Sequence, residues 1–277
     1  MSDRQRALFV AGASRGLGEA IVYAAARAGF RVGVAARSEQ AIANIATSVD
    51  GIPLELDVRD ADSCRRAVAT FASECGGIDA LVYNVGVTAA GPLASFGLST
   101  WADTYDVNVL GAVRLVQAAI PHLNTADGSD IVTIGSTASL RGFPNVAPYV
   151  ASKHALLGLT RALETEFGKK GVRCSCVCPG YIDTDMVQAA VTTMIGKGLD
   201  EAEALRRLLR EQARLLTTEE VASAVLDVVE TGPVTGSGRV VAIHPDLGPV
   251  DMSETEPNAL WAREFELTEE RVGHHVE

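Results

Sequence analysis

Positive charge is scarce in this chain of 277 residues, which has 24 Lys and Arg against 35 Asp and Glu, a net charge of −11 and a pI near 5.0. Nucleic acids and anionic membranes both require a basic surface, so neither is an expected partner. The N-terminus passes through only a short apolar run, Ala7 to Val10, before a glycine turn. We therefore predict no signal peptide and no membrane span, a cytoplasmic protein, and a small molecule as its ligand.

Cysteine is also scarce, with five residues in all. An odd number in a chain without a secretion signal argues for free thiols and against a disulfide framework. Cys174, Cys176 and Cys178 alternate along an apolar segment, which places their side chains on one face of a strand and raises the possibility of a metal site. Buried, reduced cysteines are the interpretation that we favour, and we predict no metal.

Linkers, internal repeats and low-complexity segments are missing as well, which predicts one large α/β domain followed by a tail. Short apolar segments alternate with longer helical patterns, the signature of a doubly wound parallel sheet flanked by helices. Seven strands are predicted: Ala7–Ala11, Arg31–Ala35, Ile52–Leu56, Ala80–Tyr83, Ile131–Gly135, Val172–Val177 and Arg239–Ile243. Helices are predicted between them: Gly16–Ala28, Glu39–Ser48, Ala61–Cys75, Ser99–Leu123, Ala147–Lys170 and Thr218–Glu230, the last with Thr217 as N-cap.

Two segments depart from this alternation. Residues 183–216 form an insertion after the sixth strand, with a helix predicted at Glu201–Leu215, and insertions at that end of a sheet usually cover a ligand crevice. We assign residues 1–247 to the domain and residues 248–277 to an acidic tail. The tail either docks on the domain or is disordered, and its three apolar residues, Trp261, Phe265 and Leu267, favour partial docking.

A tyrosine and a lysine four residues apart suggest proton transfer. Positions i and i+4 share one face of a helix, so Lys153 is expected to hold its ammonium near the Tyr149 phenol. A unit charge at about 4 Å would lower the phenol's pKa of about 10 by a few units. The upstream hydroxyl of Ser136 would then hydrogen-bond a carbonyl or alcohol oxygen. A chance pair on a solvated helix face is the alternative.

A glycine-rich turn follows the first strand and opens the first helix, the context that a dinucleotide-binding loop requires. Its glycines allow close approach to a pyrophosphate at the positive end of the helix. A glycine-rich turn of another kind is the alternative. The residues that we assign to cofactor binding in this loop are Gly12, Ser14, Arg15, Gly16, Leu17 and Gly18.

The end of the second strand predicts which nicotinamide cofactor is used. An acidic residue at this position would bind a free ribose 2′-hydroxyl, whereas this chain has Ala36 and Arg37. Arg37 and Arg15 together are placed to hold a 2′-phosphate, so we predict NADP(H) rather than NAD(H). The alternative is that both are ordinary surface arginines. Asp57 and Val58, at the end of the third strand, are expected to flank the adenine.

Asn108 is a polar residue among apolar neighbours in a helix expected to pack on the sheet. A buried asparagine needs hydrogen-bond partners. The pattern alone leaves two interpretations equally open, namely a catalytic residue and a residue that only bridges backbone groups.

Taken together, these motifs resemble those of the short-chain dehydrogenase/reductase family over about Leu8 to Ile243, which implies a Rossmann-like fold. The resemblance further implies a catalytic tetrad of Asn108, Ser136, Tyr149 and Lys153, in which Lys153 also binds the nicotinamide ribose and Asn108 anchors a water. It adds as cofactor-binding residues Asn84, Gly86, Pro179, Gly180, Ile182 and Thr184. It also implies a homo-oligomer, either tetramer or dimer, built on the two long central helices. Ala11 and the segment Tyr83-Asn84-Val85-Gly86 depart from the family pattern without touching the tetrad.

The expected function is therefore an NADP(H)-dependent oxidoreductase, a ketone or aldehyde reductase in which Tyr149 is the general acid/base. Lipophilic substrates are expected because the candidate substrate-facing residues are mostly apolar: Val87, Leu140, Phe143, Tyr181, Met186 and Val187. The alternatives are an NAD-linked biosynthetic or catabolic dehydrogenase and a non-catalytic sensor of the dinucleotide. A reductase of carrier-protein substrates would need a basic patch, for which Arg206, Arg207 and Arg210 are candidates.

Overall fold

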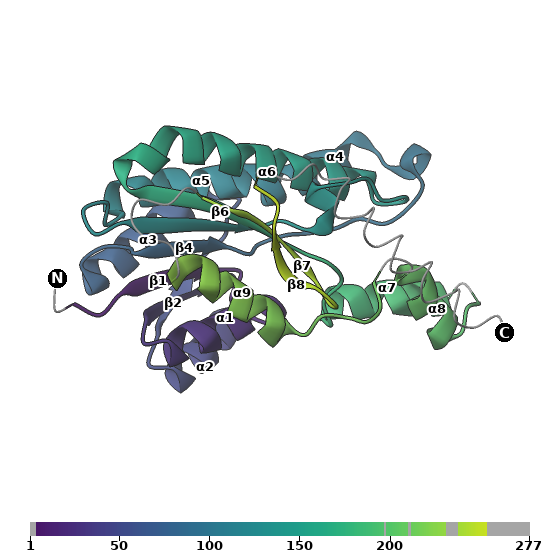
Figure 1. The fold of residues 1–277 in the computed structure, drawn as a ribbon, viewed down its shortest axis with the longest axis horizontal. Helices are drawn as coiled ribbons and strands as arrows, with labels where there is room; N and C mark the ends of the chain where they lie inside the picture. Colours follow the sequence, from purple (N-terminus) through teal and green to yellow (C-terminus); the bar gives the residue numbers. More distant parts are fainter. Residues whose placement is uncertain (1–3, 197, 210–211, 231–237, 254–277) are drawn as a thin grey trace.

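The computed structural model describes residues 4–196, 198–209, 212–230 and 238–253. It contains an eight-stranded sheet between two layers of helices, with a smaller helical pair, α7 (Asp185–Ile195) and α8 (Glu201–Leu208), standing off one end (Figure 1). The predicted doubly wound α/β fold is confirmed. Trp261, Phe265 and Leu267, for which docking was predicted, lie outside the described residues.

The strand order is β3-β2-β1-β4-β5-β6-β7-β8, and β1 to β7 are parallel to one another. Their buried, branched side chains give the nearly continuous apolar strands of a sheet covered on both faces. The bounds are β1 Ala7–Ala11, β2 Arg31–Ala36, β3 Ile52–Glu55, β4 Ala80–Tyr83, β5 Ser129–Ile134, β6 Val172–Pro179, β7 Val240–His244 and β8 Gly248–Asp251.

The strand β8 was not predicted, because its residues were assigned to the tail. It pairs antiparallel with β7 after the turn at residues 245–247, and its first residue, Gly248, adopts a positive φ of 69°. Exposed residues alternate with partly buried ones along β8, and its Gly-Pro-Val-Asp sequence has little strand character of its own. The sheet therefore extends beyond the predicted seven parallel strands by one antiparallel edge strand.

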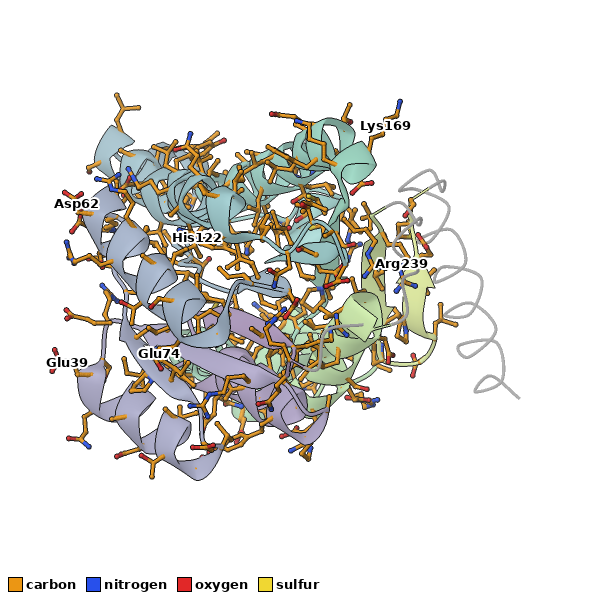
Figure 2. All side chains as sticks on the ribbon, turned by 90° about the vertical axis from the view of Figure 1, so that its left-hand side faces the viewer. Glu39, Asp62, Glu74, His122, Lys169 and Arg239 are labelled. Carbon is orange, nitrogen blue, oxygen red and sulfur yellow. The ribbon has the colours of Figure 1, made fainter. Side chains whose placement is uncertain are left out.

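Helices cover both faces of the sheet (Figure 1). One face carries α1 (Gly16–Arg27), α2 (Glu39–Ser48) and α9 (Thr218–Glu230), and the other carries α3 (Ala61–Cys75), α4 (Leu98–Tyr105), α5 (Gly111–Ala119) and α6 (Ala147–Phe167). Exposed charged side chains such as Glu39, Asp62 and Lys169 point outward from both layers (Figure 2). Among the described residues, none of the helices has the length and apolarity needed to cross a membrane.

The long helix predicted at Ser99–Leu123 is interrupted. Between α4 and α5 lies a π-helical turn, Asp106–Leu110, and α5 is followed by a 3₁₀ turn, Ile120–His122. Single π turns of this kind are often found at functional sites. The predicted helix start at Thr217 is confirmed, since the Thr217 hydroxyl accepts from the Glu220 N–H at 3.1 Å and the Glu220 carboxylate accepts from the Thr217 N–H at 2.8 Å.

All five cysteines are buried free thiols, as predicted. Cys176 and Cys178 lie with their sulfurs 3.6 Å apart on one face of β6. In the described part of the chain, no group of three or more His, Cys, Asp or Glu side chains is arranged to hold a metal ion.

Candidate active site

The predicted site residues come together at the carboxyl ends of the parallel strands. The glycine loop follows β1, Asn84 follows β4, Ser136 follows β5, and the Pro179–Thr184 segment follows β6. The sheet order places β1, β4, β5 and β6 side by side, so their following loops share one edge. This edge is where ligands bind in open α/β sheets.

The glycine loop is closely packed against the start of α1. A Cβ at Gly18 would lie 2.0 Å from the Gly12 carbonyl oxygen, and Gly12 and Gly16 have positive φ angles of 82° and 57°. Asn84 reaches across from β4, and its Nδ2 donates to the same Gly12 carbonyl at 3.0 Å. Close backbone approach at a helix N-terminus fits the diphosphate of a dinucleotide.

The two arginines predicted to hold a 2′-phosphate both lie on the surface near this loop. Arg37 is exposed at the end of β2. Arg15 is also exposed, and its Nη1 lies 3.5 Å from the carboxylate of Asp185 at the start of α7. Asp57 is half-buried and accepts from the Arg59 N–H at 2.9 Å.

Two residues of the predicted cofactor set have side chains that belong to the core. Leu17 is 7% exposed and packs in the cluster beneath α1. Val58 is 4% exposed, and its Cγ2 would lie 2.9 Å from a Cβ at Gly111. Only the backbones of these two residues are therefore available to a ligand, because their side chains fill space between helix and sheet. Ser14 is half-buried within the loop.

Tyr149 and Ser136 form the centre of the site. Tyr149 lies in the first turn of α6 and is half-buried, and the Ser136 side chain lies close enough to its phenol to act against a rise in the phenol's pKa. The Ser136 hydroxyl also accepts from the Ala138 N–H at 3.1 Å, which caps the short 3₁₀ turn Thr137–Ser139. This capping fixes the Ser136 hydroxyl beside the phenol.

The expectation that Lys153 lowers the pKa of Tyr149 is wrong for this structure. Burial raises the pKa of the Tyr149 phenol and outweighs the hydrogen bond from Ser136. The Lys153 ammonium lies 5.6 Å from the centroid of the Tyr149 ring and donates to the Ile134 carbonyl at 2.7 Å. Burial lowers the pKa of Lys153 itself to about 8.

Gly86 lies beside Lys153 and Asn108. A Cβ at Gly86 would lie 3.6 Å from both the Lys153 Nζ and the Asn108 Oδ1, an ordinary contact distance. The predicted cofactor-binding glycine and two residues of the predicted tetrad are therefore neighbours in the structure.

Asn108 is fully buried in the π-helical turn and bridges backbone groups. Its Oδ1 accepts from the Val87 N–H at 2.8 Å, while its Nδ2 donates to the Val87 carbonyl at 3.0 Å and to the Ser152 hydroxyl at 2.9 Å. Ser152 donates in turn to the Tyr149 carbonyl at 2.8 Å. The structure shows the contacts of a bridging residue, and the bridge reaches the Tyr149 backbone through Ser152, while a catalytic role for Asn108 stays a prediction.

The segment after β6 begins the insertion. Gly180 donates its N–H to the Ile243 carbonyl at 3.4 Å, and Ile182 forms an isolated parallel bridge with Leu216. Thr184 precedes α7, and its Cγ2 would lie 3.6 Å from a Cβ at Gly16. The insertion therefore starts directly above the glycine loop.

The candidate substrate-facing residues do not form one group. Phe143 and Tyr181 meet edge to face with centroids 6.4 Å apart, and the Arg141 guanidinium lies 4.5 Å from the Phe143 centroid. Val87 and Met186 are exposed, whereas Val187 is 9% exposed. The prediction that Leu140 faces the substrate is wrong. Leu140 packs with Leu157, Cys176, Cys178 and Met252 in a core cluster, because the 3₁₀ turn before it folds back onto β6.

Sequence reasoning missed three polar residues of this site. The Ser139 hydroxyl accepts from the Ser136 N–H at 3.2 Å, Ser152 links Asn108 to Tyr149, and Gln212 binds the backbone of Tyr181. Ser152 is detectable in principle, since it immediately precedes Lys153 on a helix that must pack on the sheet. Nothing in the sequence around Gln212 distinguishes it from a surface residue.

Comparison with known proteins agrees with this geometry. Residues 6–195 match the family described as short chain dehydrogenase. The chain is 30% identical over 234 residues to a 3-oxoacyl-[acyl-carrier-protein] reductase FabG of Staphylococcus aureus, covering 78% of this chain and 95% of the relative. It is 27% identical over 254 residues to a 3beta-hydroxysteroid dehydrogenase of Mediterraneibacter gnavus, covering 84% and 92%.

Among solved structures, the fold resembles that of an actinorhodin polyketide ketoreductase variant crystallised with NADPH. The TM-score is 0.81 at 26% identity, over 88% of this chain and 97% of that one. The matched span, residues 6–195, contains the glycine loop, Asn84, Asn108, Ser136, Tyr149 and Lys153.

Proposed function

Because this chain belongs to the short-chain dehydrogenase family of oxidoreductases, we propose that it is an NADP(H)-dependent enzyme that interconverts a carbonyl and a secondary alcohol. Reduction is the proposed direction in the cell. The observation that carries the proposal is the half-buried Tyr149 beside Ser136, with the Lys153 ammonium 5.6 Å from the centroid of the Tyr149 ring.

The protein's own residues supply the proton chemistry. With its pKa raised, the Tyr149 phenol is protonated at neutral pH, which is the form that gives a proton to a carbonyl oxygen as it becomes an alkoxide. Ser136 orients that oxygen by a second hydrogen bond. NADPH, when bound, supplies the hydride. The role proposed for the Lys153 ammonium is to bind the ribose of the cofactor.

The choice of NADP(H) rests on the end of β2. Arg37 follows Ala36 there in place of a carboxylate, and it is exposed, so it can approach a 2′-phosphate dianion, whereas Arg15 must share its charge with Asp185 at 3.5 Å. The resemblance to a ketoreductase crystallised with NADPH supports the same choice.

A lipophilic ketone is the proposed substrate. Phe143 and Tyr181 offer an aromatic wall, and the relatives are named for 3-oxoacyl and hydroxysteroid substrates, which join a ketone or alcohol to an apolar body. Arg206 and Arg207 both pair with Glu203, at 3.0 and 2.8 Å, so their charge is partly neutralised. This pairing favours a free small molecule over a carrier-bound substrate.

The test is NADPH oxidation with a panel of carbonyl compounds, comprising cyclic ketones, 3-oxoacyl thioesters and aliphatic aldehydes. The wild-type protein should turn over at least one class, and Tyr149→Phe should reduce kcat by about a hundredfold or more while NADPH still binds. A protein that binds NADPH without turning over any class would instead support a dinucleotide sensor. An active Tyr149→Phe variant would refute the proposed mechanism.

A further inference from the structure

A single side-chain amide joins the two ends of the insertion. The Gln212 Oε1 accepts from the Tyr181 N–H at 2.8 Å, and its Nε2 donates to the Tyr181 carbonyl at 2.7 Å. The same Nε2 donates to the Arg214 carbonyl at 2.6 Å. Gln212 thus satisfies both backbone groups of one residue, as a neighbouring strand would do.

The contact leaves no room for a side chain on the preceding residue. A Cβ at Gly180 would lie 2.2 Å from the Gln212 Oε1. One step further along, the Leu216 N–H donates to the Tyr181 carbonyl and the Asp183 N–H donates to the Leu216 carbonyl, both at 2.9 Å. The amide therefore extends a short parallel ladder by one pair, directly after β6.

The chain that carries Gln212 is itself anchored. Arg214 pairs with Glu220 of α9 at 2.5 Å and donates to the Pro245 carbonyl at 3.2 Å. Glu220 also caps α9 through Thr217. Arg214 thus fixes this segment to α9 and to the β7–β8 turn, and Gln212 of the same segment holds the backbone of Tyr181 in place.

On the opposite side, the Tyr181 ring meets the Phe143 ring at 6.4 Å and 84°. Phe143 lies in the loop that follows Ser136, so the ring contact joins this loop to the segment at the start of the insertion. We propose that Gln212 is a positioning residue that holds Tyr181 as a wall of the substrate site and thereby sets the affinity for the carbonyl substrate. This inference rests on the function proposed above.

Three variants test it. Gln212→Ala removes all three bonds, and Gln212→Glu keeps the acceptor for the Tyr181 N–H but sets a carboxylate against two carbonyl oxygens. Gln188→Ala is the control, because Gln188 is exposed on α7 of the same insertion and donates to Asp183 at 2.8 Å. We expect Gln212→Ala to raise KM for the carbonyl substrate about tenfold, with Kd for NADPH within about twofold of wild type.

Gln212→Glu gives a readout that loss of folding would not mimic. Its KM relative to wild type should be raised at neutral pH and fall back as the pH drops toward about 5, because the neutral acid regains one donor. Unchanged KM in both Gln212 variants, or an equal effect in Gln188→Ala, would overturn the proposal.

Hydrogen exchange gives a second readout, which needs no turnover. The Tyr181 amide should exchange at least about tenfold faster in Gln212→Ala than in wild type and in Gln188→Ala. If the wild-type protein turned over no carbonyl, the proposed function would fail, and the exchange rates would decide the Gln212 assignment by themselves. Unchanged exchange in Gln212→Ala would overturn it.

Discussion

The Lys153 ammonium donates a 2.7 Å hydrogen bond to the carbonyl of Ile134, the last residue of β5. Ser136 lies two residues further along, and Tyr149 lies one turn before Lys153 on α6. The bond therefore ties the strand that precedes Ser136 to the helix that carries Tyr149. It also holds a cation in a buried position, where burial lowers its pKa to about 8.

Replacing this cation should change how stability depends on pH. Above pH 8 the folded protein releases the Lys153 proton, whereas the unfolded chain keeps it until about pH 10.4, so wild-type stability gains from Lys153 as the pH rises through this window. Relative to wild type, Lys153→Met should therefore be most stable at or below pH 8 and lose about 1 kcal/mol per pH unit above it. Urea unfolding at pH 7.5 and 9.5 (about two units apart) measures this difference.

Lys169→Met is the matched control, because Lys169 is exposed just after α6. Its free energy of unfolding should follow the wild-type pH dependence. A constant difference between Lys153→Met and wild type across the window would show that Lys153 titrates as an ordinary lysine.

Gly18→Ala should impair cofactor binding. Its Cβ would stand 2.0 Å from the Gly12 carbonyl oxygen and 2.7 Å from the Asn84 Nδ2, so the loop or α1 must shift. We expect a loss of about 1–3 kcal/mol in stability and at least about tenfold weaker NADPH binding. Gly158→Ala on α6 is the control, since its Cβ would have no neighbour within 4 Å, and it should stabilise the helix slightly. Equal NADPH affinity in the two variants would contradict the proposed role of the loop.

Arg37→Asp should exchange the cofactor preference. A carboxylate at the end of β2 would repel a 2′-phosphate and accept from a free ribose hydroxyl. Fluorescence titration should show NADPH binding to wild type at least about tenfold tighter than NADH, a preference that the variant erases or reverses. Arg161→Asp, an exposed change of the same charge on α6, should keep the preference. If the wild-type protein bound NADH as tightly as NADPH, the proposed NADP(H) dependence would be refuted and an NAD-linked dehydrogenase would be the better interpretation.

Asn108→Leu should destabilise the protein by about 2–4 kcal/mol, because it removes the partner of the partly buried N–H and carbonyl of Val87 and of the buried hydroxyl of Ser152. Urea unfolding measures the loss. Asn44→Leu, at an exposed α2 residue that accepts from Gln40 at 3.0 Å, should cost less than about 1 kcal/mol. If both variants unfolded at the same urea concentration, the bridge from Val87 to Tyr149 would have no structural importance.

The sequence by itself determined the order of the strands and helices and the place of the motifs. Alternating apolar segments and amphipathic helices permit a covered parallel sheet, and every loop that follows a strand then lies at the same edge. This is why the glycine loop, Asn84, Ser136 and the segment after Pro179 could be assigned to one site before any contact was known. Local signals such as Thr217 before α9 were sufficient for the same reason, since a cap acts within one turn.

Only the tertiary structure decided the features that depend on distant segments. The helix is interrupted where Asn108 bonds to Val87 and Ser152, both distant in sequence, and β8 pairs with the edge that β7 offers. The direction of the Tyr149 pKa shift and the burial of Leu140 depend on how much protein surrounds each side chain. Gln212 binds Tyr181, which is 31 residues away in the sequence. No sequence pattern predicts a hydrogen bond at that separation, because the bond depends on where folding places the two segments.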